Sequence, residues 1–175
     1  MNEFEIVSKY LKPLSLKDLG TFKLKDDIFY DFKKGLALSL DTYVEGFHFI
    51  NSKDPKKFLR RILRASLSDL YCKGVMPKNY FLSFSVGKNL VKKKWLMKFS
   101  SILKSEQKKY KITLSGGDIT RSSRLVITII VIGHSKIMPV LRKGSNDNDD
   151  IYVTGNIGDS FLGLEILKKN LNFNK

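Results

Sequence analysis

The segment Leu114-Ser115-Gly116-Gly117-Asp118-Ile119-Thr120-Arg121 begins at the end of a β-type run, Lys111 to Ser115, and is soon followed by an apolar run, Leu125 to Gly133. We predict a short loop at the end of a strand here, because paired glycines permit a turn with positive φ and the close approach of a ligand. Asp118 is suited to hold a hard cation, and Arg121 to face a phosphate or pair with an acid. A plain hairpin turn explains the same residues, since Gly, Asp and Ser are ordinary turn residues.

Apolar patterns on both sides of this segment predict one α+β domain over residues 1–175, with a mixed or antiparallel sheet flanked by two long helices. One long helix begins at Asp54-Pro55, an acidic N-cap followed by proline, and ends near Gly74. The other is expected from Asn89 to Tyr110. Strands are predicted at 28–32, 36–42, 80–86, 111–115, 124–134 and 150–155. A helix at 3–11 lies within an N-terminal helix-and-loop segment (1–22), a final helix follows at 158–169, and the tail 170–175 is expected to fray.

Helical spacing predicts which side chains of the two long helices are buried. In the first helix these are Phe58, Leu59, Ile62, Leu63, Ser66 and Leu70, and in the second Trp95, Leu96, Phe99, Ile102 and Leu103. In the strand predicted at 36–42 the apolar residues occupy the even positions.

Composition limits the class of protein. Lys and Arg total 32 against 17 acids, a formal net charge of +15, which suits a polyanionic partner such as a nucleotide or a nucleic acid. Most of the excess is lysine on expected solvent faces, so the charge does not favour nucleic acid over nucleotide. No apolar run approaches the ~20 residues that cross a bilayer. A single cysteine forms no internal disulfide, which predicts a cytoplasmic location.

Four aspartates lie at or near the ends of predicted elements: Asp27, Asp41, Asp69 and Asp118. If they converge, each pair of charges ~4 Å apart repels by about 4 kcal/mol at an effective dielectric near 20. Protonation, pairing with Lys or Arg, or a divalent cation relieves that repulsion. Oxygen ligands without a Cys or His cluster favour Mg²⁺. Without convergence the four are surface acids. The phosphate-binding sequences of P-loop and Rossmann proteins are absent.

Four groups of residues, taken in order along the chain, resemble bacterial thiamine-monophosphate kinase, a family within the aminoimidazole ribonucleotide synthetase superfamily. The groups are Asp41-Thr42 with Val44-Glu45-Gly46 and His48-Phe49; Leu67-Ser68-Asp69-Leu70 with Gly74 and Pro77; Gly116-Gly117-Asp118 with Thr120-Arg121; and Ile151-Tyr152-Val153-Thr154-Gly155 with Gly158-Asp159-Ser160 and Gly163-Leu164. The resemblance covers nearly the whole chain.

The resemblance implies ATP-dependent phosphorylation of thiamine monophosphate to thiamine diphosphate. It assigns Mg²⁺ ligands to Asp27, Ser39, Asp41, Asp69 and Asp118, ATP contacts to Gly117, Asp118 and Arg142, and a substrate contact to His48. Metal and arginine neutralise charge on the transferred phosphoryl group, so no separate catalytic residue is required. Taken alone, His48 is more typical of a packed core histidine, and Arg142 of a solvated cation.

The chain departs from the family pattern in ways that affect activity. Lys23-Leu24-Lys25 stands where the family has Gly-x-Gly, and Ser39-Leu40-Asp41 stands where it has Ser-Thr-Asp. The resemblance covers the family's N-terminal half, and the second catalytic domain is absent from these 175 residues. We therefore expect a truncated or split half-enzyme, weakly active or inactive alone. In the superfamily the N-terminal domains pair in a dimer and close a barrel of strands, which predicts a homodimer or a partner chain carrying the second half.

Other functions remain open. One is another ATP enzyme of the superfamily, such as selenophosphate synthetase or a hydrogenase maturation factor. A second is a basic nucleic-acid-binding module that uses Lys92 to Lys94, Lys108, Lys109 and the Arg60-Arg61-Arg64 face, whose binding would fall steeply with salt. A third is a non-catalytic dimerisation module.

Overall fold

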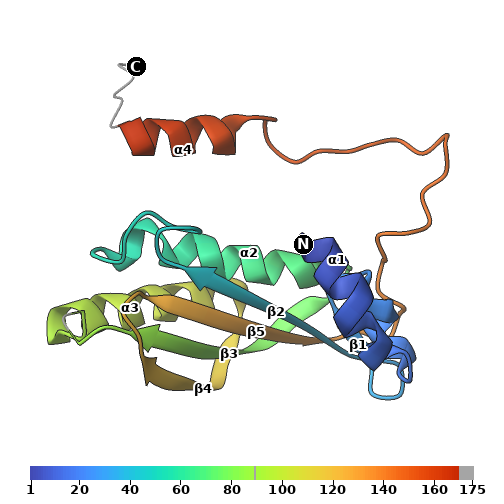
Figure 1. Cartoon of the computed structure of the whole chain (residues 1–175), viewed down its shortest axis with the longest axis horizontal. Coiled ribbons are helices and arrows are strands. Elements are labelled where there is room, and N and C mark those ends of the chain that lie inside the picture. The colour runs from blue at the N-terminus through green and yellow to red at the C-terminus, as the bar shows by residue number, and fades with distance from the viewer. Residues whose placement is uncertain (89, 170–175) are drawn as a thin grey trace. The chain divides into compact units, whose positions relative to one another are not determined.

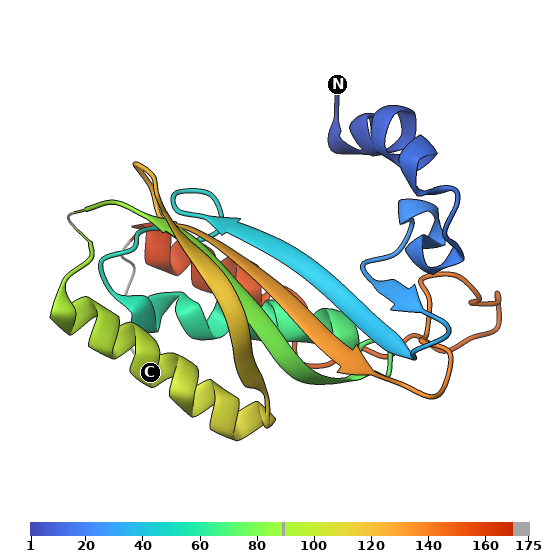
Figure 2. The same cartoon turned by 90° about the horizontal axis from the view of Figure 1, so that it is seen from below.

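A computed structural model describes residues 1–88 and 90–169 (Figures 1 and 2). The chain divides into two compact units, Met1–Arg142 and Lys143–Lys175. The predicted single domain over residues 1–175 stays a prediction. The first unit contains a sheet and the two long helices, and the second contains the final helix. Each unit is described by itself.

The sheet of the first unit has five strands among the described residues, in the order β1-β2-β5-β3-β4. Their bounds are β1 Phe29–Asp31, β2 Leu36–Val44, β3 Met76–Val86, β4 Thr113–Arg121 and β5 Val126–His134. Neighbouring strands are antiparallel except β3 and β4, which are parallel. Helix α3 (Lys93–Tyr110) connects these two strands, as a parallel pair requires. The prediction of an α+β fold with a mixed sheet is confirmed.

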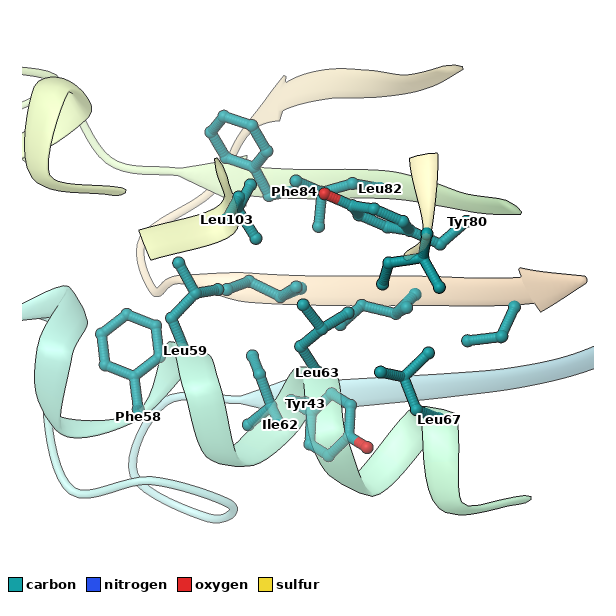
Figure 3. Packing of buried hydrophobic residues seen from close by; sticks show 14 of the residues in the cluster. Tyr43, Phe58, Leu59, Ile62, Leu63, Leu67, Tyr80, Leu82, Phe84 and Leu103 are labelled. Carbon is teal, nitrogen blue, oxygen red and sulfur yellow. The ribbon is translucent and has the colours of Figure 1, made fainter. Parts of the chain in front are cut away.

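The two long helices flank the sheet, as predicted, and both lie against the same face of it (Figures 1 and 2). Helix α2 (Leu59–Tyr71) follows a single 3₁₀ turn, Pro55–Lys57, and Asp54 caps that turn by accepting a hydrogen bond from the Lys56 amide at 3.0 Å. All six residues predicted to be buried in this helix are buried, and Figure 3 shows several of them pointing into the core.

Helix α3 confirms four of its five predicted core residues: Trp95, Phe99, Ile102 and Leu103 are buried. The prediction was wrong for Leu96, which is 37% exposed. The expected N-cap, Asn89, lies outside the described residues. Lys92 occupies the N-cap position and makes no side-chain cap hydrogen bond.

Strand β2 faces the helices with its odd positions, because Ala37, Ser39 and Tyr43 are buried there. Successive side chains of a strand point to opposite faces, so the apolar even positions point away from the helices. Leu40 is accordingly 56% exposed. This uncovered side, hereafter the open face, carries a group of apolar residues on three adjacent strands: Leu38, Leu40, Phe81, Ile130 and Ile132.

The predicted loop at Gly116–Arg121 is wrong, because these residues continue strand β4 along the edge of the sheet. Asp118 pairs in register with Ser83, and Arg121 with Val86. The glycines serve strand pairing: a Cβ on Gly117 would lie 1.8 Å from the carbonyl oxygen of Leu82. The close backbone approach expected of glycine therefore occurs here with a neighbouring strand.

A left-handed turn precedes β1 at the end of the 3₁₀ segment Leu19–Leu24. Phe22, Lys23 and Leu24 have φ values of 49°, 57° and 55°, a region that disfavours residues with a Cβ. Each such residue costs of order 1 kcal/mol. The turn leads directly into Asp26 and Asp27.

We expect Lys23→Gly to raise the free energy of unfolding by about 0.5–1 kcal/mol, because glycine adopts positive φ without the steric penalty. Lys25→Gly is the matched control, since Lys25 has φ −104° and gains nothing from glycine. Urea denaturation of both variants measures the difference. If the free energy of unfolding of Lys23→Gly is equal to or below that of Lys25→Gly, the backbone at Lys23 is not strained.

The N-terminal helix is confirmed as α1 (Glu3–Ile6) continued by a π-helical segment, Val7–Leu11. Asn2 and Glu5 form a reciprocal capping box at its start. The large apolar residues of this helix lie outside the core; Phe4, for example, is 82% exposed.

The second unit contains α4 (Asp159–Lys169), which confirms the predicted final helix. The predicted strand at 150–155 is wrong, since those residues form no strand, and Ile151 and Tyr152 are 93% and 89% exposed. A strand needs a neighbour for its backbone hydrogen bonds, and none of the other described residues of this unit forms one. The expected frayed tail, 170–175, lies outside the described residues. Across the described chain, no helix is both long and apolar enough to cross a membrane.

Candidate functional site

The last turn of α2 and the middle of β2 bring two of the predicted acids close to hydroxyl groups. Ser39 donates a hydrogen bond from Oγ to Oδ2 of Asp69 at 2.7 Å, and Tyr43 donates from its hydroxyl to Oδ2 of Asp41 at 3.0 Å. The contacts follow from the register of β2, because its odd positions, including Ser39 and Asp41, face α2. The structure thus groups Ser39, Asp41 and Asp69 on the covered face.

Asp69 is the most perturbed acid of this group. Burial raises the pKa of Asp69, and the negative charges of Asp41 and Asp27 raise it further, while the Ser39 hydroxyl opposes the shift. The carbonyl end of α2 also disfavours a negative charge. Burial raises the pKa of Tyr43, and the carboxylates of Asp41 and Asp69 raise it further, which keeps this hydroxyl protonated. A cation at this point would relieve the accumulated negative charge.

Arg142 pairs with Asp27, the third of the predicted acids. Its Nε donates to Oδ2 of Asp27 at 2.8 Å, and its Nη2 donates to Oδ1 of the same carboxylate. Such a two-pronged pair fixes the planes of both groups. The Arg142 side chain is 62% exposed, as expected of a solvated cation, but it is paired with Asp27. Its predicted contact with ATP stays a prediction.

Two further residues of the site were missed from the sequence. Lys73 Nζ lies 2.7 Å from Oδ1 of Asp26, and the two side chains are 5% and 4% exposed. Burial by itself raises the pKa of Asp26, but Lys73 and the amides of Arg142 and Asp27 outweigh it, so that this pKa lies below its ordinary value. Nothing in the sequence separates Lys73 from the many solvated lysines.

Asp118 does not lie with the other three acids in this chain. Its register partner Ser83 belongs to the open face, as does Ser85, whose hydroxyl contacts that of Thr120 at 2.5 Å. Alternation along β4 therefore places the Asp118 side chain on the open face, while Asp41 faces the helices. Three strand spacings of about 4.8 Å also separate β4 from β2.

The chemistry of the clustered groups fits a hard cation, since carboxylate and hydroxyl oxygens are the ligands that Mg²⁺ prefers. Among residues 1–88 and 90–169, however, no three Asp, Glu, His or Cys side chains are close enough to enclose a metal ion. Mg²⁺ usually binds through one or two carboxylates together with waters and substrate phosphates. The arrangement suits a metal that arrives with a nucleotide.

His48 is exposed, so the interpretation as a packed core histidine is wrong. Its Nδ1 accepts a hydrogen bond from the Val44 amide at 3.0 Å, and its ring meets the edge of Tyr43 with centroids 5.8 Å apart. Tyr43 in turn donates a hydrogen bond to Asp41, so Tyr43 links the His48 ring to the acid cluster.

A cavity of about 600 Å³ opens beside Asp27 and Arg142. The N-terminal helix forms one wall of it, and the left-handed turn forms another. Charged residues of both signs line the cavity: Glu3, Glu5, Lys12, Lys23, Lys25, Asp26, Asp27 and Arg142. A ligand that carries both phosphates and a divalent cation matches such a lining.

Part of the basic surface proposed for nucleic acid is paired within the chain. Arg64 forms two hydrogen bonds to Glu106, at 2.7 and 3.0 Å, and Arg60 lies 3.5 Å from the same carboxylate. Glu106 is 2% exposed, so these arginines hold α2 against α3. That role reduces the positive charge available to an external polyanion.

Comparison with known proteins places the chain in a family. The model of AIR synthase related protein, N-terminal domain, matches residues 24–135. The thiamine-monophosphate kinase of Buchnera aphidicola subsp. Acyrthosiphon pisum is 40% identical over 174 residues, covering 97% of this chain and 53% of that protein. The Escherichia coli K12 thiamine-monophosphate kinase is 38% identical over 140 residues, covering 79% and 42%. The chain spans about half the length of the curated relatives it matches.

Solved structures agree with this assignment. Thiamine monophosphate kinase from Aquifex aeolicus superposes with a TM-score of 0.77 at 28% identity, covering 94% of this chain and 57% of that one. AaThiL complexed with AMPPCP and TMP gives a TM-score of 0.79 at 26% identity, covering 100% and 57%. A chain of a HypE–HypF complex shares the fold alone, with a TM-score of 0.73 at 16% identity, covering 94% of this chain and 54% of that one. The chain therefore belongs to the family of AIR synthase related proteins, and it matches the N-terminal half of that family's thiamine-monophosphate kinases.

Proposed function

We propose that this chain binds Mg²⁺ and ATP and takes part in the cytoplasmic phosphorylation of thiamine monophosphate to thiamine diphosphate. The observation that carries the proposal is the cluster of Asp27, Asp41 and Asp69 beside Arg142, in a chain of this family. A relative of the same fold that was solved with AMPPCP and TMP supports the choice of ligands.

Each residue of the cluster has a defined task in this proposal. Asp27, Asp41 and Asp69 supply carboxylate oxygens for Mg²⁺, no more than two of them to one ion, and waters and ATP phosphates complete the coordination. Ser39 orients Asp69 through its 2.7 Å hydrogen bond. Bound magnesium neutralises charge on the phosphates of ATP. Arg142 exchanges its contact with Asp27 for the ATP phosphates, which frees that carboxylate for the metal.

The thiamine monophosphate site is proposed at His48, next to Tyr43 and the acids. In this arrangement the acceptor phosphate approaches the terminal phosphate of ATP at the end of β2, and catalysis comes from positioning and charge neutralisation. No residue of the chain needs to form a covalent intermediate.

Activity of the 175-residue polypeptide by itself is predicted to be weak, because it contains about half of the length of its relatives. The test is thiamine diphosphate formation from purified chain, thiamine monophosphate, ATP and Mg²⁺, with Asp69→Ala as the control for contaminating kinase. Slow turnover that Asp69→Ala abolishes supports the proposal. Robust turnover without a second polypeptide would refute the weak-activity prediction, and turnover unaffected by Asp69→Ala would refute the site.

The open face is proposed to pair with a second copy of the chain and so close a barrel of strands. Its apolar residues Leu38, Leu40 and Phe81 support this, since uncovered apolar sheet faces usually mark interfaces. Asp118 lies on the same face. In this proposal Asp118, as a ligand of ATP and Mg²⁺, and Gly117, as a contact of ATP, take up these roles only when the second copy is present.

Sedimentation equilibrium tests the pairing: wild type is expected to dimerise and Leu40→Lys to remain monomeric. Monomeric wild type at high concentration would contradict it.

A further inference from the structure

Asp26 connects three separate segments of the first unit. Its Oδ1 accepts a hydrogen bond from the Asp27 amide at 2.9 Å and lies 2.7 Å from Lys73 Nζ, just beyond the end of α2. Its Oδ2 accepts a hydrogen bond from the Arg142 amide at 3.0 Å. Both oxygens of this buried carboxylate are therefore used within the chain.

Lys73 is attached to the same segments through its backbone. Its carbonyl oxygen accepts a hydrogen bond from the Val140 amide at 3.1 Å, two residues before Arg142. A lysine that is 5% exposed is rare, because removing an ammonium group from water is costly unless a partner compensates. Here that partner is Asp26, whose carboxylate accepts hydrogen bonds from the backbone amides of Asp27 and Arg142.

We propose that the Lys73–Asp26 pair is a positioning device, which sets the backbone of residue 142 and thereby aims the Arg142 guanidinium at Asp27. Lys73 fixes the rotamer of Asp26 from one side, so that the other carboxylate oxygen faces the Arg142 amide. The Arg142 side chain then reaches Asp27, which the same carboxylate anchors through its amide. Neither Lys73 nor Asp26 needs to touch a ligand for this purpose.

A plain stabilising role gives a different expectation. Buried ion pairs are often replaceable by apolar residues without loss of stability, whereas removal of one partner leaves an uncompensated charge. If the pair only fills space, an apolar replacement of both residues leaves Arg142 on Asp27. If the pair positions Arg142, the apolar replacement folds but releases the guanidinium. That Asp27 and Arg142 bind a ligand rests on the proposed function. That Lys73 and Asp26 position Arg142 can be tested without it.

The experiment compares the hydrogen-exchange rate of the Arg142 Nε–H group by NMR in the ligand-free chain, with the resonance assigned from Arg142→Lys. The variants are Lys73→Met and the double variant Lys73→Met/Asp26→Leu. Lys98→Met is the matched control, because Lys98 makes a comparable 2.8 Å contact with Asp54 at the surface. Without nucleotide present, a failure of ATP binding cannot influence the result.

We expect exchange of the Arg142 Nε–H group at least tenfold faster in the double variant, and also in Lys73→Met where that variant folds, with no change in Lys98→Met. If Lys73→Met does not fold, the double variant decides. A folded double variant in which the Arg142 group exchanges as slowly as in wild type would overturn the proposal, as would equal acceleration in Lys98→Met.

Discussion

Asp69→Ala is expected to lower the affinity of the chain for Mg²⁺ and ATP at least tenfold, a loss of about 1.4 kcal/mol or more. Asp69 is half-buried, accepts the Ser39 hydroxyl, and bears the repulsion of Asp41 and Asp27. A bound cation relieves that repulsion, and this relief contributes to the free energy of binding. Removal of the Asp69 carboxylate removes that contribution, so binding weakens. Isothermal titration of ATP in the presence of Mg²⁺ measures the change.

Asp118→Ala provides the internal comparison for that experiment. Since Asp118 lies on the open face, its removal is expected to leave the affinity of the monomer unchanged and to weaken binding only at concentrations where a dimer forms. Affinity of Asp69→Ala equal to that of wild type would argue against the acid cluster as the binding site.

Leu63→Ala is expected to lower the free energy of unfolding by about 2–5 kcal/mol, the range for a fully buried leucine whose removal leaves a cavity. Leu63 is 0% exposed and points from α2 toward the sheet (Figure 3). Urea denaturation followed by circular dichroism gives the value.

Leu40→Ala is the matched control for Leu63→Ala. Leu40 is 56% exposed on the open face, so the same substitution is expected to change the stability of the monomer by less than about 0.5 kcal/mol. A large loss of stability from Leu40→Ala in a monomeric protein would mean that the open face is covered in solution.

Local patterns predicted the helices well, because helical spacing and capping residues are properties of neighbouring positions. Asp54 and Pro55 marked the start of the first long helix, and Leu59 and Leu63 are buried as their spacing required. Local patterns left the orientation of β2 open, and in the structure Leu38 and Leu40 point away from the helices while Ser39 is buried. Alternation of apolar and polar residues shows that the two faces of a strand differ, but it does not show which face the helices cover.

Tertiary pairing also explains the errors around Gly116, Gly117 and Asp118. Glycines next to an aspartate resemble a turn when only the sequence is considered, but their neighbour in space is β3, and the backbone of Leu82 lies against Gly117. The strand expected at 150–155 failed for the opposite reason, since its apolar residues meet no partner strand within the second unit.

The candidate site was partly predictable. The grouping of Asp27, Ser39, Asp41 and Asp69 followed from a family resemblance that carries the geometry of the whole fold. Lys73 and Asp26 were not predictable, because a buried lysine and a solvated one have the same sequence signal. Only the fold shows that the end of α2 meets the segment before β1.

The most direct test of the account is titration of the wild-type chain with ATP, once in the presence of Mg²⁺ and once in EDTA. The account predicts saturable binding of one ATP per chain with Mg²⁺, and at least tenfold weaker binding in EDTA, because the carboxylates repel the phosphates unless a cation lies between them. Equal affinity in the two conditions would contradict it.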